Sequence, residues 1–340
     1  MYANTIRSAR RNFLTQASAI GATAMLGFGR SARAEPPPET KKIRLVKIPA
    51  ICLAPEYVAE EFLRLEGFSE VEYVEEAKQS NLSDLLTANR ADVTVTAPPS
   101  FFPDLESGKQ HVALAGIHGG CYELFANEQI RSIRDLRGKR VAIEEIGSGT
   151  EYFYLASMVA YVGMNPRKDI QWVPAHTFNG MVELFVEGKA DATLAFPPQP
   201  QQLRAKKIGR VIVNTAQDRP WSEYFCCLIA ARPQFVKENP VATKRALRAI
   251  LKGADICAAD PQRAARFLSE RLYETRYPIG LEVMKGVNYA RWREANPQDT
   301  LRFHALRLHE AGMVKSDPNK LIAQGTDWRF LNELKRELKA

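Results

Sequence analysis

The chain has 340 residues, of which 45% are hydrophobic and 25% charged, with 47 basic and 39 acidic side chains and a formal net charge of +8. A chain of this length and composition is globular and long enough to bury two separate cores. Five of the basic residues and no acid fall within residues 1–34, so 42 basic side chains face the 39 acids that follow. This balance excludes the strongly basic face typical of nucleic-acid-binding proteins, and no nucleic-acid partner is expected.

Residues 1–34 have the composition of an export signal: arginines without acids, a mild apolar stretch, and the small-x-small end Ala32-Arg33-Ala34. The pair Arg10-Arg11 followed by Asn12-Phe13-Leu14 resembles a twin-arginine signal, and an ordinary secretory signal or an amphipathic tail is the alternative. The apolar stretch is too short and too polar to span a membrane. We therefore expect a periplasmic protein in which residues 35–42 form a proline-rich tether.

The stretch 139–198 repeats an earlier part of the chain. With an offset of 99 positions, Lys189-Ala190-Asp191 lies on Arg90-Ala91-Asp92, and with a slightly smaller offset Glu151-Tyr152 lies on Glu56-Tyr57. A repeat of this length corresponds to one βαβαβ unit. The sequence therefore predicts an α/β fold of two repeated βαβαβ lobes joined by a hinge, with a ligand in the cleft at the carboxyl ends of the strands.

Strand and helix patterns assign the chain to the two lobes. Residues 43–120 and 231–340 form lobe 1 with its C-terminal helices, residues 121–230 form lobe 2, and Gly119-Gly120 marks the first crossing. The apolar run 224–231 is typical of a strand that returns to lobe 1. We expect strands at 43–48, 71–74, 93–96 and 112–117, helices at 55–65, 81–88 and 101–107, and C-terminal helices at 234–239, 240–259, 261–272, 281–289, 298–311 and 327–339.

Four segments resemble those of periplasmic solute-binding proteins that serve ABC importers, the class that includes the nitrate, taurine, alkanesulfonate and thiamine-pyrimidine binders. These segments are 133–142, 147–150, 187–192 and 238–240. The resemblance implies a two-lobed Venus flytrap fold without catalysis or cofactor. It also implies a monomer that binds a small organic solute and delivers it to an ABC permease in the inner membrane. The chain departs from the family pattern at Phe196-Pro197-Pro198, where the family has Trp, an acid and Pro.

Three alternatives accompany this interpretation. A thiamine-pyrimidine precursor binder has the same fold, and Cys226-Cys227 and the acidic cleft edge are faint hints of it. A pyrimidine-forming enzyme of the same fold would use a bound iron, a cysteine-rich motif and an intracellular location. The effector domain of a transcription regulator would carry an N-terminal helix-turn-helix. The export signal argues against the last two classes.

The loop Gly147-Ser148-Gly149-Thr150 is the first candidate for ligand contact, because it precedes a helix whose free N–H groups and dipole suit a carboxylate or a sulfonate. Alternatively, Ser148 and Glu151 form a capping box that satisfies the helix start internally. The carboxylates of Glu144, Glu145 and Glu151 would repel a strong anion. The charge of the solute therefore stays open.

Other ligand contacts are expected from loops that follow strands in both lobes. Pro98 and Ser100 close a strand of lobe 1, where Ser100 can also cap the next helix. Phe196 offers an aromatic wall in lobe 2. Gln79 and His176 occupy matching loops of the two lobes, and His118 ends a strand near the crossing.

The five cysteines are widely spaced and include no CxxC pair, so their spacing predicts no metal site. Cys52 lies in the first strand-to-helix loop and is a candidate for apolar contact with the ligand. Because no nearby motif supplies a base for its thiol, packing is the alternative role and nucleophilic catalysis is not expected.

Overall fold

The computed structural model describes residues 35–48, 50–75, 82–271 and 276–339. The chain divides into two units at Pro36, and every element below belongs to the second unit, which begins at Pro37. The export signal and Gln79 expected from the sequence lie outside the described residues. None of the described helices combines the length and the apolar character needed to cross a membrane.

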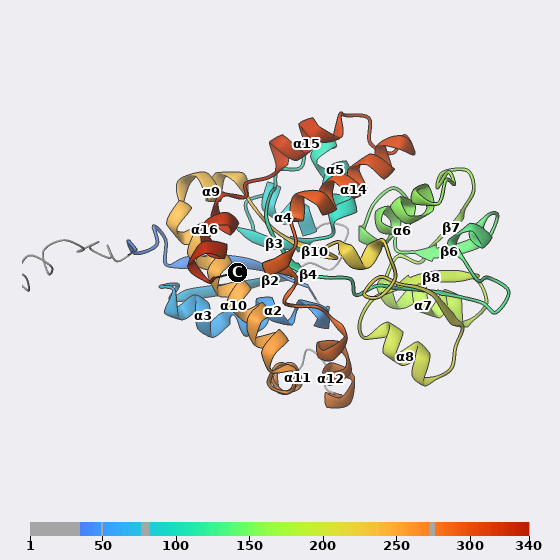
Figure 1. Cartoon of the computed structure of the whole chain (residues 1–340), viewed down its shortest axis with the longest axis horizontal. Coiled ribbons are helices and arrows are strands. Elements are labelled where there is room, and N and C mark those ends of the chain that lie inside the picture. The colour runs from blue at the N-terminus through green and yellow to red at the C-terminus, as the bar shows by residue number, and fades with distance from the viewer. Residues whose placement is uncertain (1–34, 49, 76–81, 272–275, 340) are drawn as a thin grey trace, which may run out of the picture. The chain divides into compact units, whose positions relative to one another are not determined.

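Two mixed five-stranded sheets carry the fold (Figure 1). The first has the order β2-β1-β3-β10-β4 and the second the order β7-β6-β8-β5-β9. In each sheet the first three strands are parallel, and the fourth runs antiparallel to both of its neighbours. The strands are β1 (Lys42–Lys47), β2 (Glu70–Glu75), β3 (Val93–Thr96), β4 (Val112–His118), β5 (Glu123–Ala126), β6 (Arg140–Ile143), β7 (Gln171–Pro174), β8 (Ala192–Ala195), β9 (Arg210–Asn214) and β10 (Cys227–Ala231). The expected two-lobed α/β fold is confirmed.

The two sheets have equivalent strand orders because β5 and β10 occupy the same position, the fourth, in their sheets. Strand β10 follows the strands of the second lobe in the chain, but it pairs in the first sheet. Both strands are buried along their whole length, as expected for strands covered on two faces. Because β10 pairs with β3 and β4, the chain is back in the first lobe at Cys227, four residues before the boundary expected at residue 231.

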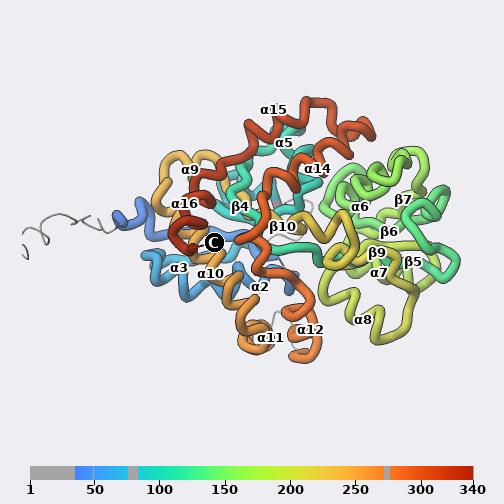
Figure 2. Tube along the Cα trace, in the orientation of Figure 1, coloured from blue at the N-terminus to red at the C-terminus, as the bar shows by residue number. Residues whose placement is uncertain are grey.

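Helices flank both sheets, and Figure 2 shows the late helix α14 beside α6 of the second lobe, which it contacts. The α-helices are α2 (Ala54–Val58), α3 (Glu60–Leu65), α4 (Leu82–Thr87), α5 (Pro98–Glu106), α6 (Thr150–Tyr161), α7 (Phe178–Val186), α8 (Gln199–Ala205), α9 (Pro233–Glu238), α10 (Pro240–Ala259), α11 (Pro261–Glu270), α12 (Tyr277–Gly286), α13 (Arg291–Glu294), α14 (Pro297–Glu310), α15 (Pro318–Gly325) and α16 (Arg329–Glu337). The described residues also form short 3-10 helices, η1 (Ile51–Leu53), η3 (Ile133–Leu136) and η4 (Trp221–Glu223).

Several helix boundaries differ from the sequence prediction. The helix expected at 101–107 begins at Pro98. Pro98 and Pro99 fit its first turn, because N–H groups there have no partner within the helix and proline lacks that group. The cap position is therefore Ala97, and the N-cap role considered for Ser100 is wrong. The helix expected at 55–65 is divided into α2 and α3, and α13 and α15 were not predicted.

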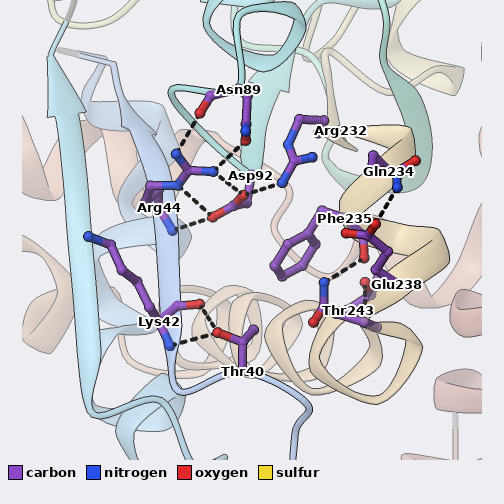
Figure 3. A network of polar contacts seen from close by, with 11 residues as sticks. Thr40, Lys42, Arg44, Asn89, Asp92, Arg232, Gln234, Phe235, Glu238 and Thr243 are labelled. Carbon is purple, nitrogen blue, oxygen red and sulfur yellow. Dashed lines mark hydrogen bonds and ion pairs between the residues drawn. The ribbon is translucent and has the colours of Figure 1, made fainter.

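One ion-pair network repeats in both lobes. Asp92, before β3, accepts hydrogen bonds from the backbone N–H and the guanidinium of Arg44 at 2.7 to 3.0 Å. Arg232, after β10, donates to the same carboxylate at 3.0 Å, and Figure 3 shows Asp92 between the two arginines. In the second lobe, Asp191 accepts the same three bonds from Arg140 at 2.8 to 3.2 Å. The aspartates of the repeated motif thus join β1 to β3 in the first sheet and β6 to β8 in the second.

Candidate functional site

A cavity lies where the carboxyl ends of β1, β3 and β8 meet the start of α6. It is narrow, with a volume of about 40 Å³, and part of it is open to solvent. Its walls are mostly apolar, and no lysine, arginine or histidine belongs to its described lining. The lining residues are Ile48, Ala50, Cys52, Leu53, Val95, Thr96, Ala97, Cys121, Tyr122, Thr150, Glu151, Phe196 and Cys227. Both lobes therefore contribute to this candidate ligand cavity.

Glu151 is the ionisable carboxyl group of the cavity wall. Its side chain is buried, and its Oε1 accepts a hydrogen bond from the Tyr122 hydroxyl at 3.1 Å. Its Oε2 is buried without a hydrogen-bond partner among the described residues. Burial, aided by the charge of Glu144, raises the pKa of Glu151 to about 8. The carboxyl group is therefore mostly protonated at neutral pH, and its proton lies on Oε2, because Oε1 accepts from Tyr122.

Glu56 is the counterpart of Glu151 in the repeat and has the same environment. It lies in the first turn of α2, and it is fully buried with neither carboxyl oxygen hydrogen-bonded within the described structure. Burial raises its pKa to about 8 as well. Two buried carboxyl groups with an unpartnered oxygen thus occupy matching positions of the repeat. Only Glu151 of the two reaches the cavity.

The start of α6 differs from the capping box considered for Ser148 and Glu151. The N-cap residue is Gly149, whose φ of 81° suits glycine, and no side chain bonds the cap. Glu151 turns into the protein toward Tyr122, and therefore the helix start is not satisfied by that side chain. From the sequence, Glu151 is expected near the ligand only as a carboxylate that repels anions or as a helix cap, and its place in the cavity wall was not predicted.

Of the residues predicted to contact the ligand, Cys52, Thr150 and Phe196 line the cavity. Phe196 stands edge-on to Tyr122, with ring centroids 6.0 Å apart, and so forms part of an aromatic wall. Gly147, Ser148 and Gly149 precede Thr150 but are not among the lining residues.

The remaining candidates lie outside the lining. Pro98 and Ser100 are buried in the first turn of α5, where the Ser100 hydroxyl donates to the Ala97 carbonyl at 3.0 Å and lies 3.5 Å from the Thr96 hydroxyl. His176 is exposed, and its backbone N–H donates to the Glu144 carbonyl. His118 is fully buried, behind the cysteines of the cavity wall.

The structure also gathers four cysteines that the sequence left scattered. Cys52, Cys121, Cys226 and Cys227 are buried near His118 at one end of the cavity, and Cys121 Sγ lies 3.1 Å from Cys226 Sγ. A hydrogen bond from Cys121 lowers the pKa of Cys52 to about 6, an effect that the His118 ring strengthens against the opposing effect of burial. Two signals in the sequence hinted at this cluster: the HxxC spacing of His118 and Cys121, and the adjacent Cys226-Cys227.

Comparisons with known proteins agree with this geometry. The family model described as NMT1/THI5 like matches residues 53–264. Curated relatives described as putative binding proteins, from Brucella abortus and Brucella melitensis, are 24% identical over 180 residues. Those matches cover 53% of this chain and 55% of each relative, so the chain spans about half the length of the curated relatives it matches.

Two solved structures share the fold over most of its length. The periplasmic nitrate-binding protein NrtA from Synechocystis PCC 6803 has a TM-score of 0.75 at 18% identity, covering 89% of this chain and 90% of its own. The alkanesulfonate-binding protein SsuA from Xanthomonas axonopodis pv. citri, bound to MOPS, has a TM-score of 0.70 at 13% identity, with 87% and 99% coverage. At these identities the similarity establishes a common fold, and the ligand has to be argued from the cavity of this chain.

Proposed function

Because the chain belongs to the NMT1/THI5-like family, we propose that it is the solute-binding component of an ABC importer and hands its solute to a membrane permease. The observation that carries this proposal is the cavity at the carboxyl ends of strands from both lobes. A binding protein of this kind works by preferring a closed, ligand-bound state over an open one, and no chemical step is needed. Delivery from the periplasm is part of the proposal and agrees with the export signal predicted for residues 1–34.

We further propose that the solute is uncharged or cationic and carries N–H donors. Glu151 Oε2 has no partner in the described structure: protonated, it donates to a ring nitrogen, and a cationic ligand that displaces its proton meets a carboxylate acceptor. Tyr122 and Phe196 supply aromatic surface for a flat ring. An anion would find no basic side chain in the described lining, only the N–H groups at the start of α6. Aminopyrimidines, which include the thiamine-pyrimidine precursors considered from the sequence, have this combination of ring and donors.

Thermal unfolding of the metal-free, reduced chain against a compound panel tests the proposal. The panel contains aminopyrimidines, amidines, alkanesulfonates, carboxylates and nitrate. A ligand at 100 times its Kd stabilises the folded state by about 2.7 kcal/mol. We expect the aminopyrimidines to stabilise the chain by this amount and so to shift its unfolding temperature upward. Glu151→Ala is expected to abolish the shift, whereas Glu128→Ala, at an exposed position, is expected to retain it.

Two other outcomes of the panel would change the proposal. Stabilisation by sulfonates or nitrate that survives Glu151→Ala would reject the solute class and favour the loop 147–150 as an anion site. Turnover of a bound pyrimidine, detected as a change in its mass, would favour the enzyme alternative over a binding protein.

A further inference from the structure

Four thiols and one imidazole meet at one end of the ligand cavity, and they come from separate parts of the chain. Cys52 lies in η1 after β1, His118 ends β4, Cys121 follows the glycine pair at the crossing, and Cys226 and Cys227 lie at the start of β10. All five side chains are at most 9% exposed. The donor atoms of Cys52, His118 and Cys121 lie within 4.8 Å of one another, and so do those of His118, Cys226 and Cys227. We call this group the thiol cluster.

The tautomer of His118 makes its ring a ready metal ligand. Its Nδ1 lies 2.6 Å from the Gly119 carbonyl oxygen, which can only accept, so Nδ1 carries the proton. In the neutral ring the lone pair is then on Nε2, which is fully buried among the cluster thiols. Histidines that bind metals are commonly held in this way, with the second ring nitrogen donating to a carbonyl.

The backbone holds the donor atoms in place. The Cys226 N–H donates to the His118 carbonyl at 3.0 Å, and the Tyr289 hydroxyl donates to the Cys52 carbonyl at 2.9 Å. Between His118 and Cys121, the chain passes so close to Thr215 that a Cβ on Gly120 would lie 2.0 Å from its carbonyl oxygen. Such support from neighbouring bonds is what positions metal ligands before the ion arrives.

We propose that the thiol cluster binds a thiophilic closed-shell metal ion, Zn²⁺ or Cu⁺, at the inner end of the cavity. Thiolate sulfur and imidazole nitrogen are the donors that these ions prefer, whereas Mg²⁺ and Ca²⁺ need oxygen ligands. Cys52, Cys121 and Cys227 also line the cavity, so the ion borders the space assigned to the solute. The inference does not depend on the proposed solute, because all the donors belong to the chain itself.

Metal retention by the full-length, reduced chain tests the proposal. The chain is stripped with a chelator under anaerobic conditions, loaded with Zn²⁺ alone, Cu⁺ alone or Fe²⁺ alone, and desalted, and the bound metal is measured by mass spectrometry. We expect one ion to be retained with Zn²⁺ or Cu⁺, and whichever of the two binds more tightly identifies the ion. Retention of Fe²⁺ alone, or of no ion, overturns the proposal.

Substitutions locate the retained ion. Cys121→Ser and His118→Gln each remove one donor, and we expect each to weaken binding at least about tenfold. Cys257→Ser is the matched control, because Cys257 is the fifth buried cysteine, lies on α10 and belongs to neither donor group. Equal binding by all three variants would place the ion elsewhere and overturn the proposal.

A measurement on the unsubstituted chain keeps the test decisive if a cluster variant fails to fold. Co²⁺ replaces Zn²⁺ at thiolate sites and then shows sulfur-to-cobalt charge-transfer absorption. We expect these bands in the folded, metal-loaded chain. A cobalt spectrum without charge-transfer bands overturns the proposal.

Discussion

Glu151 shows how one buried side chain couples stability to function. Its Oε1 is satisfied by Tyr122, while its Oε2 is kept in the cavity wall without a partner in the described structure. A buried polar atom without a bond costs about 1–3 kcal/mol of folding free energy. A ligand that forms a hydrogen bond with Oε2 offsets this cost only when it is bound, so the unpartnered oxygen favours the ligand-bound state.

The raised pKa of Glu151 predicts how its replacement by glutamine depends on pH. From about pH 4.5 to 8 the folded chain holds a proton on Glu151 that the unfolded chain has lost, so the free energy of unfolding falls as the pH rises. This one group contributes a fall of about 1.4 kcal/mol per pH unit. Glu151→Gln cannot ionise and keeps the Tyr122 contact, and it should therefore gain stability relative to the unsubstituted chain on going from pH 5 to pH 8.

Urea unfolding of both chains at a series of pH values measures that difference. Glu128→Gln removes an exposed carboxyl group and is the control, for which we expect a difference that does not change with pH. A constant difference for Glu151→Gln as well would show that Glu151 is ionised in the folded chain at neutral pH.

At the scale of the elements, the two ion-pair networks give a comparison inside one molecule. The Asp92 side chain is 5% exposed and bonds two arginines, whereas the Asp191 side chain is 19% exposed and bonds Arg140, which is itself 44% exposed. Breaking a buried pair leaves a buried charge uncompensated, while an exposed pair contributes little. We expect Asp92→Asn to cost about 3 kcal/mol and Asp191→Asn about 1 kcal/mol.

Chemical denaturation of the two variants under identical conditions checks this prediction. The two substitutions are the same and occupy matching positions before β3 and β8, so that the difference between them reports burial and the second arginine. Equal losses of stability would mean that Arg232 contributes nothing to the first network.

The repeat explains which elements could be predicted from the sequence. Residues such as Asp92 and Asp191 recur at a constant offset, and the two-lobed α/β fold followed from that recurrence. The thiol cluster could not be predicted from that recurrence, because Cys121 and Cys226 are 105 positions apart and come together only when β10 returns to the first sheet. Glu151 was assigned to a local cap because its spacing from Ser148 fits one, and only the tertiary structure shows that it turns inward.

At the scale of the whole second unit, helix α14 connects the C-terminal region to α6 of the second lobe. His304 on α14 is fully buried, and its Nδ1 lies 2.9 Å from the Ser157 hydroxyl oxygen on α6. That hydroxyl donates to the Tyr154 carbonyl at 2.7 Å, so it accepts from His304, and the ring is a neutral donor. Burial lowers the pKa of His304 to about 3, which keeps the ring neutral at physiological pH.

The contact between α14 and α6 should therefore weaken in acid, with a sign opposite to that of Glu151. Between pH 6.5 and about pH 3 the unfolded chain protonates this histidine and the folded chain does not, so the free energy of unfolding falls as the pH falls. His304→Asn should cost about 1–3 kcal/mol near pH 7 through the lost hydrogen bond and packing, and this deficit should shrink toward about pH 4.5. Urea unfolding across that range measures it, with His309→Asn on the same helix as the control. A His304→Asn deficit that stays constant down to about pH 4.5 would mean that the folded chain accommodates the imidazolium between the two helices, and that acid leaves this contact intact.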